Sequence, residues 1–243
     1  FFKQKTAYEI LTCDWSSDVC SSDLGAALLW LLGGVMAAFA QERGLGDVVY
    51  VPTPDVVVEE MLTMAKVGPN DFLIDLGSGD GRMVRVAAKK FGARGFGVDL
   101  SDDLLREANA LAISDGVSDR ARFVKQNLFD TDLNQATVIT TYLLPQMNER
   151  LRPKILALKP GTRVVAHDYS MGEWRADETK DILVPEKQVG NPGHSYVFLW
   201  IVPSRVGGRW QAQIDSKSHA GGLEIEFTQK FQELQGSAKS GGQ

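Results

Sequence analysis

The chain has 243 residues, of which 44% are hydrophobic and 23% charged, values that are ordinary for a globular protein and exclude a collagenous, disordered or many-span membrane chain. Lys and Arg number 26 against 31 Asp and Glu, and the resulting net charge of −5 argues against long nucleic acid as a partner. Both cysteines, Cys13 and Cys20, lie within the first 24 residues, which excludes disulfides, thiolate metal sites and a cysteine nucleophile from the rest of the chain.

Residues 1–24 lack apolar periodicity and contain a Ser/Asp-rich stretch unlike the sequence that follows. The string DWSSDVCSSDL at 14–24 resembles the in-frame translation of a common sequencing adapter, and KQKTAYEI at 3–10 resembles the matching primer. The alternative is a short disordered leader. We expect residues 1–24 to be an adapter-derived artefact that takes no part in the fold.

Residues 25–40 contain the uncharged apolar run AALLWLLGGVMAAFA, which ends in the small-x-small triplet Ala38-Phe39-Ala40. A helix of this length spans roughly 22 Å, less than the roughly 30 Å of a bilayer's hydrocarbon core. The pattern is typical of a secretory signal peptide, and it predicts an exported or periplasmic protein. The alternatives are an uncleaved anchor, which would hold the protein near a membrane, and a buried helix of a cytoplasmic protein.

Predicted strands and helices alternate after about residue 47. Thr53, Pro54 and Asp55 open a helix that runs to Lys66: a hydroxyl N-cap, a proline whose missing N–H costs nothing, and an acid near the positive end of the helix dipole. The elements that follow are strand 72–76, a helix with Val84, Ala87, Ala88 and Phe91 on one face, strand 96–98, a helix capped by Ser101, strands 122–125 and 137–141, helix 147–158 and strand 163–166. Repeated strand–helix units of this length predict a parallel sheet that helices cover on both faces.

The last third of the chain changes character. Residues 196–202, 209–214 and 223–231 are strand-like with no helix between them, so antiparallel strands should complete the sheet and extend beyond it. Residues 190–195 indicate a turn, and GSAKSGGQ at 236–243 is typical of a flexible tail. A single α/β domain from 47 to 235 accounts for these elements.

The sharpest chemical signal is DLGSGDG at 75–81, between a predicted strand and a predicted helix. Glycines there let the backbone turn tightly and approach a ligand, and the helix start presents free N–H groups. Asp75 opens the motif, Asp80 lies inside it, and no lysine is present to grip a phosphate. Two carboxylates disfavour a pyrophosphate and favour a cationic ligand that carries an amino-acid group.

Asp99 ends the next predicted strand, 24 residues after Asp75, where an acid can accept hydrogen bonds from both ribose hydroxyls of an adenosine ligand. Together these motifs resemble the class I S-adenosylmethionine-dependent methyltransferases over roughly residues 48–202. The resemblance implies a doubly wound, Rossmann-like, seven-stranded sheet, mostly parallel with an antiparallel C-terminal hairpin, and S-adenosyl-L-methionine as the cofactor.

The resemblance also implies roles for individual residues. Asp75 and Asp80 would lie near the methionine moiety, and Asp99 would hold the ribose. After the third strand, Asn127 would reach the adenine amino group and Leu128 would pack on the ring, where closer relatives have Gly-Asp. The remaining residues of the implied cofactor site are Gly77, Ser78, Gly79, Gly81 and Leu100, together with Tyr50 and Thr53, which would close over the cofactor from the N-terminal side.

A narrower resemblance comes from YVPTP at 50–54, GDGR at 79–82 and TYLLPQ at 141–146. This combination is similar to bacterial relatives of the ATP-synthase c-subunit lysine methyltransferase family. The segment at 141–146 lacks the Asn/Asp-Pro-Pro-Tyr string with which methyltransferases of bases and amides grip a planar nitrogen. An aliphatic amine such as lysine would instead lie in an apolar channel with aromatic walls.

Two residues are candidates for the catalytic end of this channel. Tyr142 is the candidate wall, and the alternative is a packed aromatic at a strand end. Asp168, in His167-Asp168-Tyr169 after the fifth strand, could orient the acceptor, and the alternative is a structural His-Asp pair. His194 and His219 lack a second ligand at metal spacing, so no metal site is predicted. Trp174, Trp200 and Trp210 are expected to pack against the sheet.

Three functions remain open at this point. The first is methyl transfer to a protein lysine, the second is methylation of a small molecule, and the third is binding of the nucleoside without turnover. Export would favour the third because the cofactor is made in the cytoplasm, whereas the complete motif from Asp75 to Gly81 opposes it.

Overall fold

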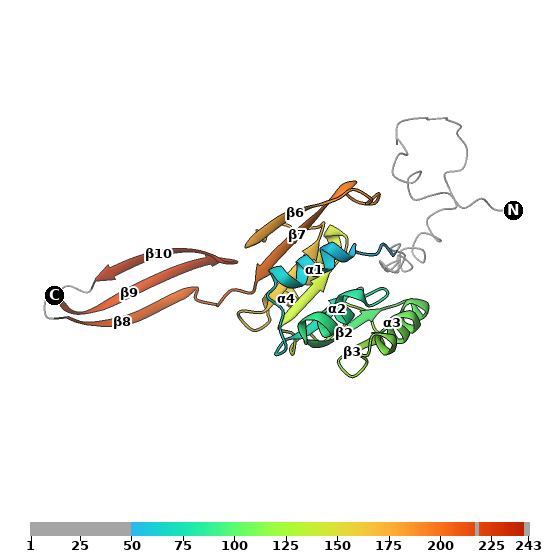
Figure 1. Cartoon of the computed structure of the whole chain (residues 1–243). Helices are drawn as coiled ribbons and strands as arrows, with labels where there is room; N and C mark the ends of the chain where they lie inside the picture. Colours follow the sequence, from blue (N-terminus) through green and yellow to red (C-terminus); the bar gives the residue numbers. More distant parts are fainter. Residues whose placement is uncertain (1–49, 217–218, 241–243) are drawn as a thin grey trace, which may run out of the picture. The chain divides into compact units, whose positions relative to one another are not determined.

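The computed structural model describes residues 50–216 and 219–240, which form two sheets (Figure 1). The predicted adapter artefact (1–24) and apolar leader (25–40) lie outside the described residues. The helices are α1 (Asp55–Met64), α2 (Arg82–Phe91), α3 (Asp102–Ser114) and α4 (Pro145–Leu156). The strands are β1 (Phe72–Leu76), β2 (Arg94–Asp99), β3 (Ala121–Lys125), β4 (Val138–Thr141), β5 (Arg163–His167), β6 (Glu178–Val184), β7 (Gly193–Ile201), β8 (Gly208–Ser216), β9 (His219–Lys230) and β10 (Glu233–Ser240).

The larger sheet has seven strands in the order β3-β2-β1-β4-β5-β7-β6. The first five pair in parallel, and β7 inserts antiparallel between β5 and β6. The expected fold class is therefore confirmed, down to the antiparallel end of the sheet. The order reverses at β1, so the carboxyl ends of β1, β2 and β4 meet at the switch point where open α/β sheets bind ligands.

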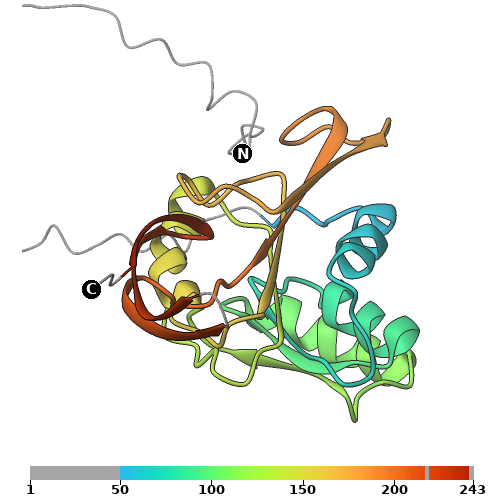
Figure 2. The ribbon, with the colours of Figure 1, turned by 90° about the vertical axis from the view of Figure 1, so that its left-hand side faces the viewer.

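Side chains of the central strands alternate between two buried layers because successive residues of a strand point to opposite faces. Leu73 and Val138 pack with α1, α2 and α3, whereas Ile74 and Ile139 pack with α4. In Figure 2, α4 (yellow) and the first three helices (blue to green) lie on opposite sides of the sheet. None of the helices in 50–216 and 219–240 has the length and apolar character of a membrane span.

The start of α1 differs from the expectation. Pro54 is the N-cap and no side chain caps the helix, so the prediction of a Thr53 cap was wrong. The Thr53 hydroxyl instead lies 3.2 Å from Nδ1 of His167 at the end of β5. The cap predicted for α3 is confirmed, since Ser101 Oγ accepts a hydrogen bond from the Leu104 N–H.

Two strands were not predicted. β6 is one, and β10 is the other, which pairs antiparallel with β9 in a second, three-stranded sheet of order β10-β9-β8. The prediction of a flexible tail from 236 is therefore wrong for 236–240, which belong to β10. The predicted turn at 190–195 is shorter than expected, because β7 already begins at Gly193.

The turn between β9 and β10 contacts the core around Trp174. This indole is fully buried, stacks on Phe231 with ring centroids 6.2 Å apart, and donates from Nε1 to Gln232 Oε1 at 3.0 Å. Trp200 is also buried and donates to the Trp174 carbonyl at 2.7 Å, as expected for packing residues. Trp210 differs, because it lies in β8 of the smaller sheet and is 48% exposed.

Candidate active site

The glycine motif forms the turn between β1 and α2. The N–H groups of Gly77 and Ser78 both donate to the Val98 carbonyl of β2, at 2.9 Å, which ties the turn to the neighbouring strand. Gly79 has φ +53°, and a Cβ there would lie 2.1 Å from a ring carbon of Tyr50. Both the backbone conformation and the close approach of the ring therefore require glycine at this position.

Asp99, the last residue of β2, faces this turn. Its Oδ2 accepts the Gly79 N–H at 2.9 Å, and its Oδ1 accepts the Ser101 N–H at 2.9 Å. The motif and the partner acid, 20 residues apart, are thus in direct contact. A carboxylate oxygen has two lone pairs, so each oxygen of Asp99 retains one acceptor position for a ligand hydroxyl.

Asp75 lies opposite Thr140 of β4 in the sheet and is buried. Its Oδ1 accepts the Thr140 hydroxyl at 2.7 Å. Burial raises the pKa of Asp75 to about 7, and the negative charges of Asp99 and Asp80 add to the rise. A positively charged ligand beside this carboxyl would favour its ionised form.

Asp80 pairs with Arg82 rather than remaining free in the turn. The guanidinium donates from Nε to Oδ1 at 3.0 Å and from Nη2 to Oδ2 at 2.7 Å. Burial alone would raise the pKa of Asp80, but these hydrogen bonds hold it below its usual value. Tyr50, whose ring covers Gly79, has its pKa raised to about 12 by burial and by the nearby Asp80 charge, so the phenol stays protonated.

The two residues expected near adenine, Asn127 and Leu128, lie on the loop after β3, and Leu100 of the implied cofactor site lies on the loop after β2. Leu100 is 51% exposed immediately after Asp99, and Leu128 is partly buried against the core. Asn127 is exposed, and its Oδ1 accepts the Phe129 N–H at 2.9 Å. A carbonyl oxygen has two lone pairs, so a ligand amino group at Asn127 would share this oxygen with the backbone.

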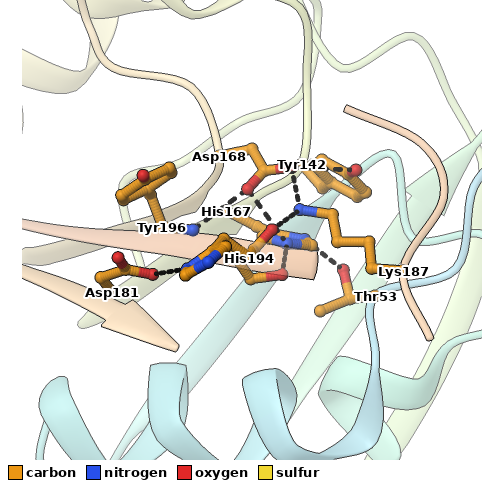
Figure 3. A network of polar contacts seen from close by, with 9 residues as sticks. Thr53, Tyr142, His167, Asp168, Asp181, Lys187, His194 and Tyr196 are labelled. Atoms are coloured by element: carbon orange, nitrogen blue, oxygen red, sulfur yellow. Dashed lines mark hydrogen bonds and ion pairs between the residues drawn. The ribbon is translucent and has the colours of Figure 1, made fainter. Parts of the chain in front are cut away.

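A second polar cluster lies at the ends of β4 and β5 (Figure 3). The Tyr142 hydroxyl donates to Asp168 Oδ2 at 3.4 Å, and the Tyr142 ring lies on the imidazole of His167 with centroids 3.9 Å apart. Burial raises the pKa of Tyr142, with the Asp168 charge adding to the effect. The two predicted catalytic residues are thus brought together.

Asp168 is held from several sides. Its backbone has φ +60°, a left-handed conformation that is uncommon outside glycine but tolerated by aspartate. Its N–H donates to the Tyr196 carbonyl at 2.7 Å, and its Oδ1 accepts the Tyr196 N–H at 3.1 Å. These bonds to β7 fix the carboxylate in a strained position of the kind often found at functional sites.

Lys187 is a member of this cluster that the sequence did not suggest. Its ammonium donates to Asp168 Oδ2 at 2.5 Å and to the His194 carbonyl at 2.7 Å, and its side chain is 5% exposed. No motif or periodicity marks a lysine in a polar loop as buried, so only the tertiary structure reveals it. The imidazole of His194 lies outside this contact, paired with Asp181 at 2.9 Å.

His167 connects this cluster with the glycine turn. Its Nδ1 lies 3.2 Å from Thr53 Oγ1 and its Nε2 lies 3.0 Å from Ser195 Oγ. The Thr53 carbonyl in turn accepts from Arg82 Nη1 at 2.7 Å, the same guanidinium that binds Asp80. Burial lowers the pKa of His167 to about 4, so the ring is neutral at neutral pH and serves as a hydrogen-bonded spacer.

Comparison with known proteins places this arrangement in a family. The family described as the ANTKMT methyltransferase domain matches residues 75–178, which include the glycine turn, Asp99, Tyr142 and Asp168. A protein-lysine N-methyltransferase of Saccharolobus islandicus is 44% identical over 155 residues, which cover 63% of this chain and 92% of that protein. The ATP synthase c-subunit lysine N-methyltransferase of Rattus norvegicus is 32% identical over 133 residues, which cover 54% of this chain and 60% of that protein.

A solved structure agrees with this placement. The crystal structure of an RNA methyltransferase from Salinibacter ruber in complex with S-adenosyl-L-homocysteine has a TM-score of 0.59 and 43% sequence identity, and the match covers 64% of this chain and 96% of that one. Three observations support the same family assignment. They are the sheet order, the hydrogen bond between the glycine turn and Asp99, and matches that cover more than nine-tenths of two known proteins. The chain belongs to the class I S-adenosylmethionine-dependent methyltransferases, in the family that includes the protein-lysine N-methyltransferase of Saccharolobus islandicus.

Proposed function

We propose that this enzyme transfers a methyl group from S-adenosylmethionine to the side-chain amine of a protein lysine. The observation that carries the proposal is the pairing of two sites on neighbouring strand ends. One is a glycine turn bonded to Asp99, and the other is a carboxylate, Asp168, beside the ring of Tyr142. Relatives named as lysine methyltransferases support the choice of acceptor.

The residues of the glycine turn fit the cofactor. At Gly77 and Gly79 a Cβ would meet the side chains of Leu143 and Tyr50, so the turn stays narrow, and the buried Ser78 Oγ has no hydrogen-bond partner among the described residues. Asp99 retains acceptor positions for the ribose hydroxyls, and the exposed Leu100 offers an apolar surface for adenine. When bound, the cofactor supplies an activated methyl group on a sulfonium.

The charged residues of the turn have different roles in this proposal. Asp75 lies next to the turn with a pKa near neutrality, so a cationic amino-acid group is expected to draw it into the ionised form. Asp80 is occupied by Arg82, which favours a role in fixing the turn over direct contact with the cofactor. Tyr50 and Thr53 both contact the turn from the N-terminal side. The Tyr50 ring lies over Gly79, and the Thr53 carbonyl accepts a hydrogen bond from Arg82.

The acceptor end needs to hold a lysine, remove its proton and exclude water. The face of the Tyr142 ring attracts a cation, and the Asp168 carboxylate can accept an ammonium N–H at Oδ2. The raised pKa of Tyr142 means that its hydroxyl donates rather than acts as a base at neutral pH. Desolvation favours the neutral form of the acceptor amine, so its proton passes to the Asp168 carboxylate and on to solvent, which frees the nitrogen lone pair for the methyl group. Alignment and desolvation then supply much of the rate, because the methyl group is already activated.

RNA is a second candidate acceptor, because the Salinibacter ruber structure is described as an RNA methyltransferase. Two features of this chain favour lysine. The net charge is −5, so the electrostatic attraction that dominates RNA binding is weak. The segment after β4 is Tyr142-Leu143-Leu144-Pro145, without the polar head that grips a planar nitrogen.

The acceptor class is tested by following label from tritiated S-adenosylmethionine. The purified protein is incubated with poly-L-lysine, with total RNA, and with an envelope extract that also supplies small molecules. We expect label in polypeptide, and none with the variant Gly79→Arg, whose side chain would enter the space of the Tyr50 ring. Label in RNA or only in small molecules would assign a different acceptor, and no transfer with intact cofactor binding would indicate a non-catalytic binder.

We also propose export, which rests on the apolar run at 26–40 alone. A fusion of residues 25–60, behind a start codon and a short basic leader, to a reporter active only outside the cytoplasm tests it. Reporter activity is expected, and its absence would contradict export.

A further inference from the structure

The loop between β6 and β7, residues 185–192, places one side chain into the acceptor cluster. Lys187 is buried, whereas the other residues from 185 to 190 are exposed, Val189 to 51%. Figure 3 shows the Lys187 ammonium directed at the Asp168 carboxylate beside Tyr142. The contacts are 2.5 Å to Asp168 Oδ2 and 2.7 Å to the His194 carbonyl.

These contacts are those that an acceptor lysine would need. The ammonium is bound by a carboxylate and a carbonyl, and the carboxylate oxygen is shared with the hydroxyl of Tyr142. Lys187 therefore occupies the Asp168 carboxylate, which is the group proposed to bind the acceptor amine. We propose that Lys187 is an internal stand-in for the acceptor lysine, and that the loop 185–192 must withdraw it before the acceptor amine can bind at Asp168. This inference rests on the proposed lysine methylation.

The few contacts that hold the loop are consistent with an ion pair between Lys187 and Asp168 that can open. Its backbone bonds are local: the Lys187 N–H donates to the Val184 carbonyl at 3.0 Å, and the Gly193 N–H donates to the Lys187 carbonyl at 3.1 Å. Gly190 lies against the carboxylate, where a Cβ would be 2.8 Å from Asp168 Oδ2. With little apolar burial in the loop, the ion pair is its main anchor, and a second ammonium at Asp168 competes with it directly.

A buried ion pair is by itself weak evidence for a stabilising role, because the desolvation of both charges offsets their attraction. A structural role and a stand-in role predict opposite effects of removing the lysine. If Lys187 only supports Asp168, its loss impairs catalysis. If it competes with the acceptor, its loss makes the site easier to enter.

The first experiment measures methyl transfer to poly-L-lysine by the variants Lys187→Gln and Lys187→Ala. We expect KM for poly-L-lysine to fall at least threefold, with unchanged affinity for S-adenosylhomocysteine. The matched control is Lys180→Ala, which removes a surface lysine paired with Glu60 and should leave KM unchanged. An unchanged or increased KM, or a loss of kcat that added n-butylamine restores, would overturn the proposal in favour of a structural role.

The second experiment uses the wild-type protein and does not depend on turnover. Acetic anhydride is applied with and without n-butyltrimethylammonium, which has the charge of a methylated lysine side chain and no reactive N–H. Mass spectrometry should show acetylation of Lys187 at least threefold faster with the probe present, and no change at Lys180. Equal or slower acetylation of Lys187 would refute displacement, whereas failure of methyl transfer with positive labelling would instead count against the proposed function alone.

Discussion

At the scale of single residues, burial raises the pKa of Asp75 and lowers the pKa of His167, so both shifts favour the uncharged side chain. Asp75 has a pKa of about 7 against 3.8 for an ordinary aspartate, so the folded protein holds a proton that the unfolded chain releases, and stability falls as pH rises through this window. His167 has a pKa of about 4 against 6.5, so the unfolded chain takes up a proton that the folded protein refuses, and stability rises with pH. The two contributions largely cancel between about pH 4 and 7.

Replacing Asp75 with Asn removes the contribution of Asp75 to the pH dependence of stability, while the amide oxygen can still accept the Thr140 hydroxyl. The stability of Asp75→Asn relative to wild type should increase as pH rises from about 4 to about 7, by up to about 4 kcal/mol. Urea unfolding at several pH values measures this difference. Asp103→Asn, at a position whose side chain is 85% exposed, is the control and should show no such trend. Parallel pH profiles for Asp75→Asn and wild type would contradict the raised pKa.

How far residues could be predicted depends on whether their role is local. The sequence positions of Asp75 and Asp99 at strand ends singled them out; in the structure Asp99 accepts the Gly79 N–H of the glycine turn, whereas Asp75 accepts the Thr140 hydroxyl of β4. The burial of Lys187 could not be predicted, because the tertiary structure brings its ammonium to Asp168, 19 residues away in the chain. The contact of Thr53 is also set by the tertiary structure. Its hydroxyl was predicted to cap α1, but it contacts His167 of β5 instead.

At the scale of elements, the predicted alternation held wherever strands are buried on both faces. β6, with the sequence ETKDILV, was missed because it is an edge strand whose charged residues are exposed. β10 was missed because its Gly/Ser-rich composition is that of a tail, while pairing with β9 overrides that preference. Both errors lie where neighbouring strands, rather than local pattern, decide the structure.

The contact of the β9–β10 turn with the core makes Trp174 the most informative aromatic to change. The variant Trp174→Ala removes a fully buried indole together with its stacking on Phe231. We expect a loss of about 3–5 kcal/mol in the free energy of unfolding, measured by urea denaturation. Trp210→Ala, at a half-exposed position in β8, should cost about 1 kcal/mol or less. Similar losses for the two variants would show that this contact contributes little.

At the scale of the whole molecule, the cofactor and acceptor ends share one face of the sheet. Asp75, Thr140 and His167 occupy alternate strand positions on the side of α1, α2 and α3. Hydrogen bonds through Thr53 and Arg82 connect the acceptor cluster with the glycine turn. The sheet order therefore positions both ends, and the loop 185–192 controls which amine reaches Asp168.

Calorimetric titration with S-adenosylhomocysteine tests the central claim most directly, because it isolates the cofactor end from the acceptor end. Wild type should bind one equivalent, and Asp99→Ala should bind about tenfold to hundredfold more weakly, through the loss of charge-assisted hydrogen bonds. Tyr142→Phe, at the acceptor end, should bind as wild type does. Equal affinity of wild type and Asp99→Ala, or no binding by wild type, would contradict the assignment of the glycine turn and Asp99 as the cofactor site.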